Sequence, residues 1–229
     1  EACPDAAWVM ANRWCANALM RLGRLAEAHD RLEHALVRSQ ALGDFNSQVE
    51  VLRSLVSLHV MRGNLIEAGR LFDQVWALRG QVRARDEWLM WRLRGHLATS
   101  QHDYAQALAA YQQALACAQQ IEDSFAQLLL EERLGETYLG MGQLATAHDF
   151  LARALAGFRR AGAGEYQVLA SFHLSRVLIL NGQPEPAAQL LREALSLAQH
   201  PEAPLPILAP RNAFADALLK DPDLSLQAF

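Results

Sequence analysis

The chain has 229 residues and a net charge of −4, and 52% of its residues are hydrophobic while 20% are charged. This composition excludes an intrinsically disordered chain, and the slight negative charge disfavours direct nucleic-acid binding, which normally needs a basic surface. No apolar run reaches the ~18 residues of a membrane span, so no membrane insertion is expected.

Apolar periodicity and stop signals predict helices along almost the whole chain. Glycines such as Gly23 and Gly142 mark helix ends, because glycine adopts the left-handed conformation at least cost. A shorter helix near 207–219 is expected to cover the last hairpin. The other predicted helices span residues 5–22, 25–42, 45–62, 65–80, 84–101, 104–122, 124–141, 144–161, 165–181 and 184–199.

These helices pair into repeats of nearly constant length. Each second helix begins with a short motif that closes on an alanine, and these alanines follow one another at intervals of 39 or 40 residues. They are Ala28, Ala68, Ala107, Ala147 and Ala187. Such a period predicts an all-α stack of helix-turn-helix hairpins over residues 1–199, with a cap helix and tail over 200–229. The repeats are approximately 5–42, 45–80, 84–122, 124–161 and 165–199.

The fourth repeat carries the most specific residue pattern: Leu134-Gly135, Tyr138, Gly142, Leu144, Ala147, Leu151 and Ala154. This pattern resembles the tetratricopeptide repeat in its longer variant, with a period near 40 instead of the usual ~34 residues. That variant is similar to the repeats of bacterial LuxR-type regulators of the maltose-activator kind. The resemblance implies a right-handed α-solenoid of five hairpins whose first helices line a concave groove.

The family's groove positions can be transferred to this sequence one residue at a time. In repeats one to three the resemblance implies a ladder of arginines with polar neighbours, and in repeats four and five it implies a mainly apolar surface. Arginine forks bind carboxylates, so a peptide with acidic and apolar anchors suits such a groove. The residues expected to contact a partner are Arg13, Asn17, Arg53, Ser57, Arg92, His96, Leu129, Glu132, Leu169, Phe172 and Arg176.

The ladder also has an interpretation without a ligand. Arg92 can pair with Glu132, and Arg53 with Glu50 three residues before it, which would make the arginines a solvated ion-pair network. Likewise, Phe172 and its apolar neighbours can pack under the C-terminal helix. The sequence leaves both interpretations open.

Side chains that could carry chemistry show no convergent arrangement. No histidine pair has the spacing of metal ligands on one helix, so neither a metal nor a cofactor is expected. Glu131, Glu132 and Glu136 favour an exposed acidic face over acid/base catalysis. No catalytic residue is predicted, and we expect the chain not to be an enzyme.

Three hypotheses of function follow. The first is a non-enzymatic scaffold within a bacterial signalling or transcription regulator, which binds a protein or peptide segment in the groove. The second is a domain that senses a small-molecule inducer such as an oligosaccharide, and the third is self-association, for example as a homodimer. Because the chain does not begin with Met, we expect it to be a fragment of a longer protein whose effector domain lies elsewhere.

The cysteines favour a cytoplasmic location. Cys3, Cys15 and Cys117 form no CxxC pair and no framework of the secreted kind. Cys15 falls on the packing stripe of the first helix and is expected to be a buried, inert thiol.

Overall fold

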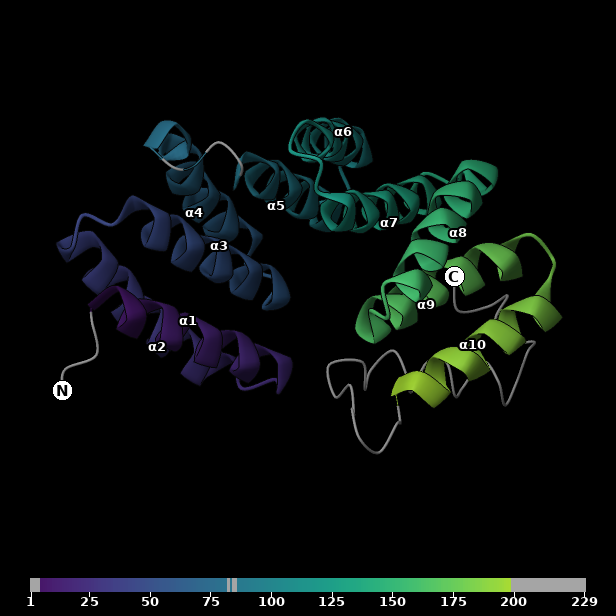
Figure 1. Ribbon diagram of the computed structural model, residues 1–229, viewed down its shortest axis with the longest axis horizontal. Coiled ribbons are helices and arrows are strands. Elements are labelled where there is room, and N and C mark those ends of the chain that lie inside the picture. Colours follow the sequence, from purple (N-terminus) through teal and green to yellow (C-terminus); the bar gives the residue numbers. More distant parts are fainter. Residues whose placement is uncertain (1–4, 82, 84–85, 199–229) are drawn as a thin grey trace. The chain divides into compact units, whose positions relative to one another are not determined.

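The structure is a computed structural model that describes residues 5–81, 83 and 86–198, and over this range the chain is all-α (Figure 1). The predicted helix bounds are confirmed to within three residues at every end, while the predicted cap helix near 207–219 lies outside the described residues. The elements are α1 (Asp5–Arg21), α2 (Leu25–Ala41), α3 (Phe45–Met61), α4 (Leu65–Ala77), a short 3-10 helix η1 (Arg79–Gln81), α5 (Glu87–Ser100), α6 (Tyr104–Gln120), α7 (Ser124–Gly140), α8 (Leu144–Arg160), α9 (Gly164–Leu180) and α10 (Pro184–Ala198).

The helices form two compact units, Glu1–Ile121 with α1 to α6 and Glu122–Phe229 with α7 to α10. Within each unit, consecutive helices pack as hairpins: α1 with α2, α3 with α4 and α5 with α6 in the first unit, and α7 with α8 and α9 with α10 in the second. The first helix of a hairpin also contacts the first helix of the next, as α1 does with α3, α3 with α5 and α7 with α9. The predicted stack of hairpins is therefore confirmed inside each unit.

Two glycines explain how closely the helices of a hairpin approach. A Cβ atom on Gly95 of α5 would lie 2.5 Å from Cε1 of Tyr111 on α6, and one on Gly135 of α7 would lie 2.6 Å from Cγ of Leu151 on α8. Ordinary carbon contacts are ~3.5–4 Å. Both partner side chains are fully buried, so each hairpin depends on the missing glycine side chain.

The helix ends follow the predicted turn chemistry. Gly142, after α7, has a φ of 72°, and His102 occupies the equivalent place after α5 with a φ of 59°. Aspartates cap the starts of α3, α6 and α7: the side chains of Asp44, Asp103 and Asp123 each accept a hydrogen bond from a backbone N–H in the first helical turn. Such caps satisfy N–H groups that have no partner inside the helix.

One packing prediction is wrong. Cys15 is exposed, not buried. The core residues of α1 are Val9, Ala16 and Met20, and within the described residues no earlier hairpin covers the face on which Cys15 lies.

Candidate functional site

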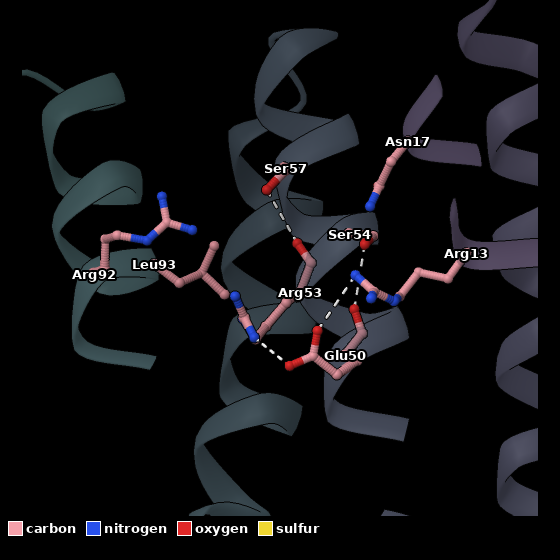
Figure 2. A pocket seen from close by; sticks show the side chains of 8 residues that line it. All are labelled: Arg13, Asn17, Glu50, Arg53, Ser54, Ser57, Arg92 and Leu93. Atoms are coloured by element: carbon pink, nitrogen blue, oxygen red, sulfur yellow. Dashed lines mark hydrogen bonds and ion pairs between the residues drawn. The ribbon is translucent and has the colours of Figure 1, made fainter. Parts of the chain in front are cut away.

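A pocket of about 230 Å³ lies in the first unit, between the first helices of its three hairpins (Figure 2). It brings together five of the residues predicted to contact a partner, and adds Glu50, Ser54 and Leu93 to them. The lining residues come from α1 (Arg13, Asn17), α3 (Glu50, Arg53, Ser54, Ser57) and α5 (Arg92, Leu93). The side chains converge because equivalent positions of successive repeats lie next to one another.

Glu50 is the centre of the pocket's ion pairs. Its carboxylate lies between two guanidinium groups (Figure 2): Arg53 Nη1 donates to Glu50 Oε1 at 2.5 Å, and Arg13 Nη1 lies 3.3 Å from Oε2. Only 15% of the Arg13 side chain and 13% of the Arg53 side chain are exposed. The pairing of Glu50 with Arg53, which the sequence left as an alternative, is confirmed.

One carboxylate does not use all the donors of the two arginines that it bridges. The Nε atoms of Arg13 and Arg53 are buried and have no hydrogen-bond partner. Burial lowers the pKa of Arg53 below its ordinary value, and the charge of Arg13 adds to this effect, while Glu50 opposes it. Arginine stays protonated at neutral pH even so, and the two guanidinium groups on one carboxylate therefore leave the pocket with an excess of positive charge.

The remaining lining groups leave the pocket rich in donors. The hydroxyls of Ser54 and Ser57 donate to backbone carbonyls one turn earlier on α3. Arg92 lines the far side, and its guanidinium carbon lies 5.9 Å from the ring centroid of Trp88. Arg92 and the amide of Asn17 add donors to those of the other two arginines. The chemical complement of such a pocket is a carboxylate, which accepts only.

The predicted apolar surface of the second unit packs largely against α10. Leu169 is buried in a cluster with Ala194 and Ala198. Phe172 packs against a cluster that includes Ile179 and Leu191, and Leu129 is half-buried against the core of α7 to α9. Little of Leu169 is left for a partner to touch.

The prediction of an exposed acidic face on α7 is wrong. Glu132 is buried, with 4% of its side chain exposed, and hydrogen-bonds to His173 at 2.8 Å. Glu131 and Glu136 are half-buried. The reason is that α9 packs on α7 and brings His173 against Glu132. Sequence reasoning missed His173, although a histidine among the apolar residues Ala170, Leu174 and Val177 of α9 was a usable signal.

The two remaining predicted residues do not line the pocket of the first unit. His96 is half-buried on α5 and does not line it. Arg176 is half-buried on α9, in the second unit.

Comparison with known families supports the repeat assignment. The sequence profile described as tetratricopeptide repeat matches residues 88–160 and 128–200, a little under half of the chain. Residues 88–200 carry tetratricopeptide repeats. Two overlapping matches offset by one repeat length agree with the period of 39 or 40 residues.

Several solved structures share the fold of this chain. A STAND signal transduction ATPase from Pyrococcus horikoshii, with a tetratricopeptide repeat sensor, matches with a TM-score of 0.65 and 19% identity over 94% of this chain and 34% of its own. Aspartyl phosphate phosphatase F from Bacillus subtilis gives a TM-score of 0.71 at 14% identity, over 95% of this chain and 57% of that one. PilF of Pseudomonas aeruginosa gives a TM-score of 0.60 at 18% identity, over 98% of this chain and 97% of its own.

At these identities the similarity shows the fold alone. The chain spans about a third of the STAND protein that it matches. None of the curated proteins matches the sequence. Among the helices that the structure describes, none is long and apolar enough to cross a membrane.

Proposed function

We propose that this chain is a non-enzymatic interaction module of a bacterial signalling or transcription regulator, and that the pocket between α1, α3 and α5 binds an acidic side chain of a protein or peptide partner. The observation that carries the proposal is the largely buried pair Arg13 and Arg53, two guanidinium groups that share the carboxylate of Glu50. Partly desolvated guanidinium groups bind a carboxylate more strongly than exposed ones do.

The size of the pocket supports a side chain as its occupant. Its volume of about 230 Å³ lies below the ~300–1,000 Å³ of sites that enclose a drug-sized ligand. An Asp or Glu side chain fits such a space, and the rest of a peptide would lie along the neighbouring first helices. Extended or helical peptides gain their affinity from several such anchors.

The relatives support the regulator part of the proposal. The STAND protein carries its tetratricopeptide repeats as a sensor next to a signal transduction ATPase, and tetratricopeptide repeats generally bind protein or peptide segments. A module of this kind needs no chemistry of its own, so the proposal includes no catalytic step.

The test is a peptide array in which every acidic peptide is matched with its Asn/Gln counterpart. We expect peptides with at least one Asp or Glu to be selected, and their binding to fall at least tenfold in Arg53→Gln and in Arg92→Gln. Arg70→Gln is the matched control, because Arg70 is exposed on α4 and pairs with Glu67. Selection without a carboxylate preference, or equal loss in the control, would contradict the proposal.

A second candidate is a small-molecule inducer that carries a carboxylate. The polar lining and the small volume favour such a ligand over an oligosaccharide. Thermal shift separates a carboxylate ligand from an oligosaccharide, because a ligand at 100 times its Kd adds ~2.7 kcal/mol of stability. Stabilisation by succinate or citrate that is absent in Arg53→Gln would favour this candidate, and stabilisation by maltotriose alone would contradict the carboxylate assignment.

A further inference from the structure

We propose that Glu136 and His173, in the second unit, bind a divalent transition-metal ion, and that Glu132 holds the imidazole of His173 in the orientation that this requires. The site lies between α7 and α9 and is independent of the arginine pocket. Candidate ligand atoms of the three side chains all lie within 4.8 Å of one another.

Each of the two glutamates presents one carboxylate oxygen to Arg133 and the other to His173. Arg133 holds the Oε2 atoms: its Nε lies 3.2 Å from Glu132 Oε2, and its Nη1 donates to Glu136 Oε2 at 2.6 Å. The Oε1 atoms face His173 instead, with Glu132 Oε1 at 2.8 Å from Nδ1 and Glu136 Oε1 at 3.8 Å from Nε2. An ion on the histidine side therefore does not have to displace Arg133.

The distance between Glu136 Oε1 and His173 Nε2 indicates the place of the ion. At 3.8 Å the two atoms are too far apart for a hydrogen bond. They are suitably placed for two ligands of one ion, because a metal bonds to each at ~2.0–2.2 Å. Within the described part of the chain, the only hydrogen bond of the His173 ring is the one at Nδ1.

Glu132 fixes which nitrogen of the ring can bind a metal. An ionised carboxylate only accepts hydrogen bonds, so Nδ1 carries the hydrogen and donates it to Glu132. In the neutral imidazole the lone pair is then on Nε2, the nitrogen that lies 3.8 Å from Glu136 Oε1. A carboxylate behind the ring is the common arrangement around metal-bound histidines, since it sets the tautomer and raises the basicity of the ligand.

The donor set selects the class of metal. One imidazole and carboxylate oxygen suit Zn²⁺, Co²⁺ and similar ions, whereas Ca²⁺ and Mg²⁺ prefer oxygen alone. The surroundings also favour a cation, because Glu132 and Glu136 bring two carboxylates to the site. Waters complete the coordination on the side of Glu136, which is 27% exposed, whereas His173 is 3% exposed. The bound ion would link α7 to α9.

The test is titration of the untagged 229-residue chain with Co²⁺, followed by its visible absorption bands, and with Zn²⁺ by calorimetry. The background is Cys15→Ser, because Cys15 is a free, exposed cysteine and thiols are ligands for the same ions. We expect one site per chain. Glu136→Gln and His173→Gln should raise the Kd at least tenfold, and Glu132→Gln should raise it about 10- to 100-fold.

Two further variants make the outcome decisive. Glu131→Gln is the matched control on the same helix; Glu131 pairs with Arg153 and not with His173, so the Kd should stay unchanged. Arg133→Gln removes a competing positive charge and should tighten binding without removing a ligand. If His173→Gln does not fold, as judged by circular dichroism, Glu136→Gln carries the test, since Glu136 is half-buried. Absence of Co²⁺ bands at millimolar metal, or equal binding in Glu131→Gln and Glu136→Gln, overturns the proposal.

Discussion

Replacing Gly135 by alanine tests whether the close approach of α7 and α8 holds the fourth hairpin together. The added Cβ would lie 2.6 Å from Cγ, 2.9 Å from Cδ2 and 3.2 Å from the backbone N of Leu151. Because Leu151 is fully buried and a backbone atom is among those contacts, the side chain cannot simply turn away. The helices must separate instead.

Two opposing effects set the size of the loss. Overpacking a well-packed core lowers the free energy of unfolding by ~1–3 kcal/mol, while alanine in place of glycine inside a helix raises it by ~0.5–1 kcal/mol. We therefore expect a net loss of about 1–2 kcal/mol, which for a chain of this length lowers the Tm by ~2–8 °C. Gly69 of α4 is the matched control, since a Cβ there has no atom within 4 Å, so Gly69→Ala should raise the Tm.

The measurement is thermal unfolding followed by far-ultraviolet circular dichroism. Gly135→Ala is then repeated in a Leu151→Ala background, where the clash is smaller and the loss should shrink, as expected for residues in contact. A Gly135→Ala chain as stable as the Gly69→Ala chain would refute the argument. So would an equal loss in both backgrounds.

Three other changes test local features of the fold. Asp44→Ala removes the cap of α3 and should cost ~0.5–2 kcal/mol at pH 7. The side-chain hydrogen bond from the serine three residues later, and then backbone hydrogen bonds, lower the pKa of Asp44, so its stabilisation is complete above about pH 4 and is lost as the pH falls through the folded pKa. In urea titrations, the difference in unfolding free energy between Asp44→Ala and the unchanged chain should therefore be smaller at pH 3 than at pH 7. His102→Gly relieves a left-handed conformation at φ 59° and should stabilise by up to ~1 kcal/mol; a lower Tm contradicts this. Glu50→Gln leaves two largely buried guanidinium groups without their shared carboxylate and should cost ~1–3 kcal/mol. Glu87→Gln removes only an exposed charge in the first turn of α5 and should cost less, under ~1 kcal/mol in the same melt.

The sequence predicted helices and hairpins well because their signals are local and recur. Glycines end the helices, alanines return every 39 or 40 residues, and together they place each boundary. The meeting of Arg13, Arg53 and Arg92 around one pocket was predictable for the same reason, since equivalent positions of neighbouring repeats lie side by side. Glu50 was visible as a partner only because it lies three residues before Arg53.

The environment of Glu132 was not predictable in this way. Its hydrogen-bond partner, His173, is 41 residues away in the sequence, and periodicity on α7 alone cannot show which polar group of α9 packs against it. The exposure of Cys15 was missed because a stripe on one helix says where a neighbour would pack, and not whether a neighbour is there. Both errors concern contacts between hairpins.

Glu50 has a consequence for the energetics of recognition. A long arginine side chain carries ~2 kcal/mol of rotamer entropy, which a binding event normally has to remove. Here Glu50 already holds the guanidinium groups of Arg13 and Arg53, so most of this ordering takes place during folding and not during association. The pocket is thus preorganised, and the carboxylate that we propose as its ligand would meet donors already fixed in direction.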